Sequence, residues 1–312
     1  MIKNVLVLGG TGFVGRHVVP KLVAAGHRVV VPTRSRDRAR PLFPLPTCTI
    51  IEADVHDRAA LGRLARGSDA VVNLVGILHE VGRETFARAH VDLTRNAIAA
   101  CRDSGVRRYV HMSALNAAPD GPSRYQRSKG EAEALVMDSG LDWTIFRPSV
   151  IFGRGDSFLS MFAKLVGVMP VVALAAAGSR FQPVWIGDVA HCFTQAVDDP
   201  RTVGQRYDLC GPTAYTLREL VALVGAITGH ARPIVPLGPG LSSLQARVLE
   251  MLPGPLMTRD NLASMQQDNV CDCPFPPVFG VRPASIEAIA PAYLAPSSIR
   301  SPYDDFRAQG GR

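Results

Sequence analysis

Two residues with useful chemistry stand at a helical spacing in the segment SRYQRSKGEAE, residues 123–133. Tyr125 and Lys129 are four positions apart at the start of a helix predicted over residues 126–138, so they share one face of it. A tyrosine hydroxyl, with a pKa of about 10, is a poor base at neutral pH, but a nearby ammonium group lowers that pKa. The pair could then exchange a proton with a hydroxyl or carbonyl group. The alternative is that Tyr125 caps the helix and Lys129 is solvated.

A glycine-rich turn near the start of the chain predicts a cradle for phosphate groups. Directly after the apolar run 4–8, glycine recurs at every third position. Glycine allows a sharp turn and a close approach of backbone amides to a pyrophosphate, at which the next helix would point its positive N-terminus. A strand before the turn and a helix after it are the context that dinucleotide binding requires. The residues expected to contact the dinucleotide are Gly9, Gly10, Thr11, Gly12, Phe13, Val14 and Gly15.

The residues after the second predicted strand indicate which dinucleotide binds. NAD-selective folds place a carboxylate there for the ribose 2′-hydroxyl, whereas this chain has Arg34 and Arg36. Guanidinium groups pair well with a phosphate dianion, so we expect a preference for NADP(H), with NAD(H) as the alternative. The two arginines could instead belong to a solvated loop. Asp54 and Val55 end the third predicted strand, where adenine would rest.

The first half of the chain alternates apolar runs with helical patterns, which predicts an α/β fold with a doubly wound parallel sheet, the Rossmann fold. Several of the runs are rich in valine, as strands buried on both faces should be. Four of the helices run into a glycine, at Gly26, Gly67, Gly105 and Gly140. Pro20 stands inside the first helix, where it should remove a hydrogen bond. The predicted strands are residues 4–8, 28–31, 49–53, 70–74, 108–112 and 143–146, and the predicted helices are residues 13–25, 58–66, 84–103 and 126–138.

This order of elements gathers the candidate residues at one edge of the sheet. Ligands of open α/β sheets bind beyond the carboxyl ends of the strands. Gly9, Asn73 and Ser113 end the first, fourth and fifth predicted strands, and the helix that carries Tyr125 must begin at the same edge. A tyrosine there could move a proton while a hydride moves at a nicotinamide ring, and Ser113 would orient the carbonyl group.

These motifs, in this order, resemble the extended or atypical short-chain dehydrogenase/reductase superfamily. The resemblance covers roughly residues 1–230 and includes FRPSVIFG at residues 146–153, which is similar to the segment beside the nicotinamide. It implies a catalytic group of Ser113, Tyr125 and Lys129. The further cofactor-binding residues that it implies are Asn73, Leu74, Val75, Gly76, Met112, Arg147, Pro148, Ser149 and Val150, together with Tyr125 and Lys129.

A closer resemblance is to bacterial relatives of the NAD(P)H-binding accessory subunit of respiratory complex I. It is carried by SALNAAPDGPSRYQRSKGEAE, GLDWTIFRPSVIFGRGDSFL and TRDNLASMQQDNV. That group includes members in which the nucleotide is structural rather than consumed, and it resembles proteins linked to quinone biosynthesis. It implies NADP(H) as cofactor and leaves two main hypotheses, an oxidoreductase or a non-catalytic nucleotide carrier in a respiratory or quinone-synthesising assembly. A redox-sensing regulator is a third.

One position departs from the dehydrogenase pattern. His90, in HVDLTRN at residues 90–96, replaces an asparagine that commonly supports the active-site water in the superfamily. The replacement puts the proton relay in doubt. His90 could serve in its place, activity could be slow or absent, or the histidine could be structural.

The second half of the chain is irregular and would supply the substrate side. Residues 1–150 are expected to form the dinucleotide-binding domain, to which residues 181–211 return, and residues 151–180 and 212–295 the substrate or partner region. The apolar segment 158–178 could line a site for a hydrophobic or quinone-like substrate, or be an ordinary core helix. Segment 241–252 has helical apolar spacing and could lie on a membrane, on a partner or on the protein itself. A loose tail is expected over residues 296–312.

Composition narrows the range of partners. A formal charge of +7 favours anionic partners, but no Lys/Arg run is interleaved with aromatic residues, so nucleic acid is not expected. We find no signal peptide and no apolar run long enough to cross a bilayer, and therefore expect a cytoplasmic protein, with a peripheral position at the inner face of the membrane as a further possibility. The scattered cysteines predict reduced thiols and no metal site. They are Cys48, Cys101, Cys192, Cys210, Cys271 and Cys273.

Overall fold

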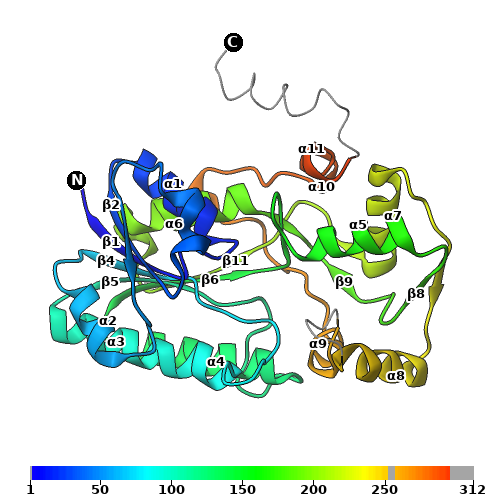
Figure 1. The fold of residues 1–312 in the computed structure, drawn as a ribbon, viewed down its shortest axis with the longest axis horizontal. Helices are drawn as coiled ribbons and strands as arrows, with labels where there is room; N and C mark the ends of the chain where they lie inside the picture. Colours follow the sequence, from blue (N-terminus) through cyan, green and yellow to red (C-terminus); the bar gives the residue numbers. More distant parts are fainter. Residues whose placement is uncertain (1, 252–256, 296–312) are drawn as a thin grey trace, which may run out of the picture.

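The computed structural model describes residues 2–251 and 257–295, and its centre is a seven-stranded parallel sheet (Figure 1). The strand order is β11-β6-β5-β4-β1-β2-β3. The chain runs from β1 outward to β3 and then returns to place β4 on the other side of β1, which is where a doubly wound sheet opens its ligand crevice. The predicted fold class is confirmed. The strands are β1 (Asn4–Leu8), β2 (Arg28–Thr33), β3 (Cys48–Glu52), β4 (Ala70–Asn73), β5 (Arg108–Met112), β6 (Asp142–Pro148) and β11 (Gln205–Leu209).

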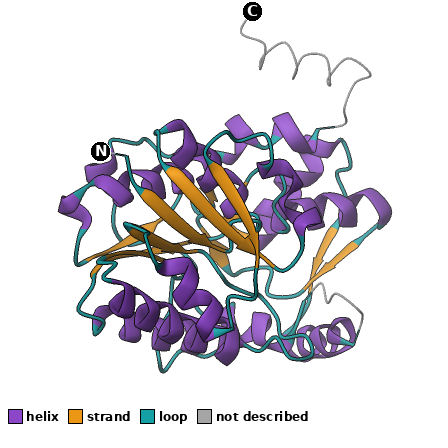
Figure 2. Cartoon of the chain, turned by 60° about the vertical axis from the view of Figure 1, so that its left-hand side comes forward, coloured by secondary structure: helices purple, strands orange, loops and turns teal. Residues whose placement is uncertain are grey.

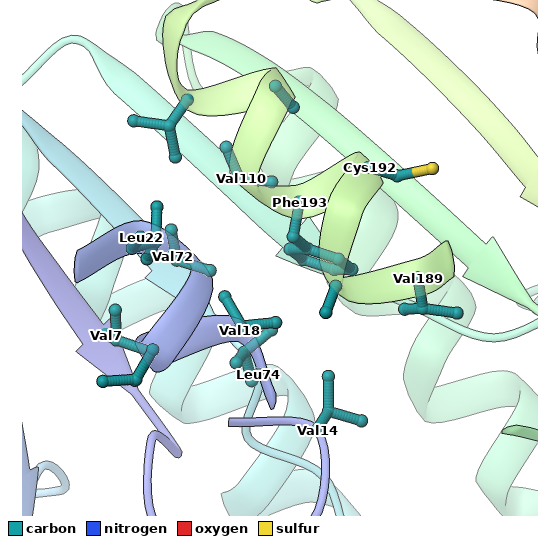
Figure 3. Packing of buried hydrophobic residues seen from close by; sticks show 14 of the residues in the cluster. Val7, Val14, Val18, Leu22, Val72, Leu74, Val110, Val189, Cys192 and Phe193 are labelled. Carbon is teal, nitrogen blue, oxygen red and sulfur yellow. The ribbon is translucent and has the colours of Figure 1, made fainter. Parts of the chain in front are cut away.

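Helices cover both faces of this sheet (Figure 2). One face packs against α1 (Gly15–Ala24) and α6 (Ile186–Asp198), with Val7, Val18 and Phe193 in a shared core (Figure 3). The other face packs against α2 (Arg58–Ala65), α3 (Leu93–Ser104) and α4 (Arg124–Met137). Neighbouring residues of β1 alternate between the two cores, as the period of two in a strand requires.

The ends of the helices follow the local signals in the sequence. Gly26, Gly67, Gly105 and Gly140 all have positive φ, between 67° and 90°, which a residue with a side chain adopts only at a cost. Pro20 remains inside α1. One predicted helix differs, because residues Ala87–Asp92 form a π-helical turn, η2, before α3 begins.

The C-terminal half builds a third core beside the sheet. Helix α5 (Phe158–Val168) packs its apolar face against α7 (Leu217–Thr228), with Leu159, Phe162 and Leu220 buried between them. The apolar segment 158–178 therefore contributes largely to a core. Further elements are β7 (Ile151–Phe152), β8 (Val172–Leu174), β9 (Arg180–Phe181), β10 (Val184–Trp185), β12 (Tyr215–Thr216), β13 (Ile234–Pro236), α8 (Pro239–Glu250), α9 (Arg259–Ser264), α10 (Ile286–Ile289), α11 (Pro291–Leu294) and the short 3-10 helices η1 (Arg36–Leu42), η3 (Pro200–Thr202) and η4 (Pro277–Phe279).

The structure corrects the expectation about the cysteines and does not describe the predicted tail. Cys210 and Cys271, which are 61 positions apart, form a disulfide, so the expectation of six reduced thiols is wrong. The pairing depends on the fold bringing the end of β11 beside the segment after α9. The predicted tail, residues 296–312, lies outside the described residues. Within the described ranges, no helix is both long and apolar enough to cross a bilayer.

Candidate nucleotide-binding site

The turn between β1 and α1 has the geometry of a phosphate cradle. Gly9 has φ +79° and its carbonyl accepts a hydrogen bond of 3.0 Å from the amide of Gly12. A Cβ on Gly15 would stand 2.4 Å from the Cα of Gly10, so only glycine lets α1 start this close to the strand. Among described residues, the amides of Phe13 and Val14 have no hydrogen-bond acceptor. Amides at a helix N-terminus attract anions, so the turn fits a pyrophosphate.

The loop after β4 forms the opposite wall of the cradle. A Cβ on Gly9 would stand 3.0 Å from the backbone of Leu74 and Val75. The side chain of Asn73 holds this loop in place. Its oxygen accepts a hydrogen bond of 3.2 Å from the amide of Val75, and its nitrogen donates one of 3.1 Å to the hydroxyl of Tyr109. Asn73 therefore acts on the crevice through the backbone that it holds.

The expected adenosine end contains several charges. The guanidinium of Arg34 donates a hydrogen bond to Glu84, whereas Arg36 begins η1 and places its guanidinium 5.8 Å from the ring centre of Phe43. Asp54 accepts a bond of 3.0 Å from the amide of His56, and Val55 packs against the core below α2. Of the two predicted arginines, Arg34 thus pairs with a residue of the loop after β4, and Arg36 lies on an aromatic ring.

Lys129 lies buried between the ends of β4 and β5. Its ammonium nitrogen donates to the carbonyl of Met112 at 3.0 Å, and a Cβ on Gly76 would stand 3.2 Å from it. A capping box of Ser123 and Gln126 starts α4 and so fixes where Lys129 points. Burial lowers the pKa of Lys129 from 10.5 to about 8, although the nearby carboxylate of Glu133 opposes the shift.

Tyr125, one helical turn earlier, lies half-buried against two other rings. The ring centres of Phe86 and His90 are 5.9 and 5.6 Å away, both edge to face. Burial raises the pKa of the Tyr125 hydroxyl to about 12. The expectation of a lowered pKa is therefore wrong for this structure, because desolvation of the phenolate outweighs any help from the lysine.

His90 is held at both ring nitrogens. Nε2 accepts a bond of 3.1 Å from the amide of Ile77, so the proton lies on Nδ1, which donates to Ser128 Oγ at 2.8 Å. Ser128 in turn donates to the carbonyl of Tyr125 at 2.8 Å. Burial, followed by the charge of Lys129, lowers the pKa of His90 to about 2. His90 is thus a neutral ring that joins the loop after β4 to α4, and its structural interpretation is favoured over a relay role.

The structure places the hydroxyl of Ser113 toward Glu133. Ser113 donates to this carboxylate, which is almost fully buried and has Arg147 Nε at 3.1 Å. Burial raises the pKa of Glu133, and the hydrogen bond from Ser113 opposes the shift. The structure therefore groups Ser113 with Glu133 and Arg147, while it packs Tyr125 against Phe86 and His90.

The remaining predicted residues follow β6 and have protein partners. Arg147 also donates to the carbonyl of Ala117 at 2.5 Å, and Ser149 Oγ lies 2.6 Å from Asn269 Oδ1. The carbonyls of Pro148 and Val150 accept bonds from Leu115 and Val184 at 3.0 Å. This segment thus ties the sheet to the C-terminal half, and its contact with a nucleotide stays a prediction.

Sequence reasoning missed three acidic residues around the crevice. Glu84 and Glu133 are described above, and Asp260 of α9 accepts bonds from the amides of Arg124 and Tyr125 at 2.7 and 3.1 Å. Only Glu133 had a usable signal, since it stands four positions after Lys129 on the same helix face. Asp260 and Glu84 meet their partners across 135 and 50 positions of sequence.

Comparison with known proteins identifies the relationship. Residues 9–156 match a family model described as NAD(P)H-binding. The mouse (Mus musculus) mitochondrial NADH dehydrogenase [ubiquinone] 1 alpha subcomplex subunit 9 is 31% identical over 290 residues, which cover 90% of this chain and 77% of the mouse protein. This chain belongs to the subunit 9 family. The resemblance inferred from the sequence motifs is thereby confirmed.

Two other proteins that are similar to this chain carry the names of enzymes. A ceramide reductase from Caulobacter vibrioides is 31% identical over 186 residues, 60% of this chain and 58% of that protein. The Escherichia coli NADPH-dependent quinone oxidoreductase QOR2, solved with NADPH, superposes with a TM-score of 0.74 at 22% identity, over 92% of this chain and 98% of the other. The structural likeness shows that the two proteins share a fold.

Proposed function

We propose that this protein is an NADP(H)-dependent oxidoreductase that acts on a hydrophobic carbonyl or hydroxyl compound or a quinone. The observation that carries the proposal is the buried ammonium of Lys129 at the ends of β4 and β5, one turn after Tyr125. An ammonium has three donors, and the carbonyl of Met112 accepts one of them. Within the described residues no hydrogen bond engages the other two, which would bind ribose hydroxyls of a nucleotide in the glycine cradle.

The raised pKa of Tyr125 fits a proton donor better than a base. A phenol whose pKa is about 12 keeps its proton at neutral pH. The bound nucleotide would supply the hydride. Tyr125 would give its proton to the substrate oxygen, so that a carbonyl that gains a hydride and a proton becomes a hydroxyl, and the phenolate would regain its proton from water. Lys129 would stabilise that phenolate while it lasts.

The preference for NADP(H) rests on Arg34. Its guanidinium follows β2 directly, where a 2′-phosphate would lie, and β2 ends in Thr33 without a carboxylate. Asp54, two residues after β3, accepts a hydrogen bond from the amide of His56. NAD(H) is the alternative that a binding comparison decides.

The second candidate function is a non-catalytic NAD(P)H-binding accessory or assembly protein of a respiratory or quinone-synthesising complex. Two observations favour it, namely the hydroxyl of Ser113 donated to Glu133 and His90 occupied at both nitrogens. The surface for a complex or for the inner face of a membrane would be α8, whose Leu241, Leu244 and Val248 are all more than half exposed.

One experiment separates the two functions. The purified protein is loaded with NADPH, and oxidation is followed by fluorescence with menadione, a short-chain ubiquinone and decanal as probes. Loss of a general acid lowers turnover by about 100-fold or more, so Tyr125→Phe should do so with an unchanged dissociation constant for NADPH. Tyr215→Phe, which removes a hydroxyl bonded to Glu287 in the C-terminal half, is the matched control. Tightly held NADPH that no probe oxidises would support the accessory function.

A further inference from the structure

A ten-residue segment follows the loop after β4, and two of its glutamates form ion pairs with other elements, at two places. This strap, residues 77–86, contains a tight turn in which Val81 and Glu84 exchange backbone hydrogen bonds of 3.1 and 3.0 Å. At one place Glu80 pairs with Arg124 at 2.7 Å, at the start of α4. At the other place Glu84 pairs with Arg34 after β2. The strap thus links the Tyr125 end of the crevice to its adenosine end.

The sheet order shows where the second tie lies. Arg34 follows β2 and Glu84 belongs to the connection after β4, while β1 stands between these two strands. Their side chains meet only by reaching over the carboxyl end of β1, which carries the glycine turn. The carboxylate of Glu84 is therefore held at the adenosine side of the cradle, where a ribose next to the pyrophosphate would lie.

The surroundings of Glu84 leave part of its hydrogen-bonding capacity free for a ligand. Oε1 accepts from Arg34, while Oε2 lies 3.9 Å from Nε2 of His56, beyond hydrogen-bond distance. Burial, followed by the charge of Arg88, lowers the pKa of His56, which disfavours a charged ring beside Glu84. A carboxylate with two oxygens accepts more bonds than this, and the side chain is 30% exposed.

We propose that Glu84 is the residue that discriminates between NAD(H) and NADP(H), acting from the wall opposite β2. Its carboxylate accepts the ribose 2′-hydroxyl of NAD(H), as the acidic residue at the end of the second strand does in other dinucleotide folds. It also repels a 2′-phosphate and competes with it for Arg34, which limits the preference for NADP(H). The inference rests on the proposed dinucleotide site and deepens it.

The test compares two glutamates of the same strap. Dissociation constants for NADPH and NADH are measured on the full chain by fluorescence of the reduced nicotinamide. In Glu84→Gln, NADPH should bind about threefold more tightly because a partly exposed competing charge is lost, and NADH about tenfold more weakly because a charged acceptor is lost. Glu80→Gln removes another carboxylate of the same strap, one that accepts from Arg124 and from the amide of Phe86, and it should leave the ratio of the two constants unchanged.

Two outcomes would overturn the inference. If Glu84→Gln leaves the ratio unchanged, or if Glu80→Gln shifts it equally, Glu84 only fastens the strap. Arg34→Ala tests the underlying proposal separately, because it should weaken NADPH alone. An unchanged NADPH affinity in Arg34→Ala, with a shifted ratio in Glu84→Gln, would refute the role of Arg34 and keep that of Glu84. Thermal unfolding of each variant shows that the fold is intact.

Discussion

Replacement of Lys129 by methionine should make the protein more stable at neutral pH, although it removes a residue of the proposed nucleotide site. Lys129 is 2% exposed, and its pKa falls from 10.5 to about 8 through burial. That shift corresponds to about 3 kcal/mol of unfavourable free energy for keeping the ammonium charged inside the fold. Methionine fills similar space without the charge but leaves the carbonyl of Met112 without its donor, which costs about 1 kcal/mol. We expect a net gain of about 2 kcal/mol in the free energy of unfolding at pH 7.

The gain should depend on pH in a defined direction. Between about pH 8 and 10.5 the unfolded chain binds a proton at Lys129 that the folded chain has lost. The stability of the wild type therefore rises with pH in this window, because the unfolded state binds more protons. The advantage of Lys129→Met should then shrink from pH 7 to pH 10. Urea denaturation at both pH values, followed by circular dichroism, measures the difference.

A matched control separates burial from simple loss of charge. Lys164 is an exposed lysine on α5, and Lys164→Met should change the free energy of unfolding by no more than about 0.5 kcal/mol at either pH. Equal stability of wild type and Lys129→Met at pH 7, or a difference that stays constant to pH 10, would refute a buried ammonium. Lys129→Met should also bind NADPH more weakly than the wild type, which would show that the destabilising charge lies in the proposed nucleotide site.

Two further predictions concern the contacts that join the halves of the protein. Asp260→Ala should lower the free energy of unfolding by about 1 to 2 kcal/mol in urea denaturation, because two amides at the start of α4 lose a charged acceptor. Asp260→Asn should lose less stability, because it keeps an acceptor without the charge. Equal losses in the two variants would argue against a charge effect. Reduction of the disulfide between Cys210 and Cys271 should lower the free energy of unfolding by about 4 kcal/mol for a 61-residue separation. A reductant should lower the unfolding temperature of the wild type and of Cys273→Ser but not that of Cys210→Ser. An unchanged unfolding temperature in the wild type would contradict the pairing.

The elements that sequence predicts well are those whose signals are local. The helices predicted to run into Gly26, Gly67, Gly105 and Gly140 end before those residues, and each of the four glycines has positive φ. The glycine turn could also be predicted from the sequence, because its strand, turn and helix are consecutive in the chain. In each case the hydrogen bonds or packing that decide the structure join residues close in sequence.

The parts that sequence did not predict depend on contacts between distant segments. The π-helical turn η2 carries His90 between the amide of Ile77 and the hydroxyl of Ser128, and the second of these is 38 positions away. Arg34 was expected to be ready for a phosphate, but it already has a partner in Glu84. A motif gives the type and position of a side chain, whereas the direction in which it points depends on which partner the fold brings within reach.

Ser113 shows how such a partner bears on the choice between enzyme and carrier. A hydroxyl group can donate a single hydrogen bond, and the Ser113 hydroxyl donates it to the carboxylate of Glu133. It then offers a ligand only lone pairs, which attract a donor such as a carboxamide and not a carbonyl oxygen. An enzyme that needs Ser113 to polarise a carbonyl must first protonate Glu133, whose pKa is raised by burial, or break this contact. A carrier needs neither step, because it does not have to polarise a carbonyl group.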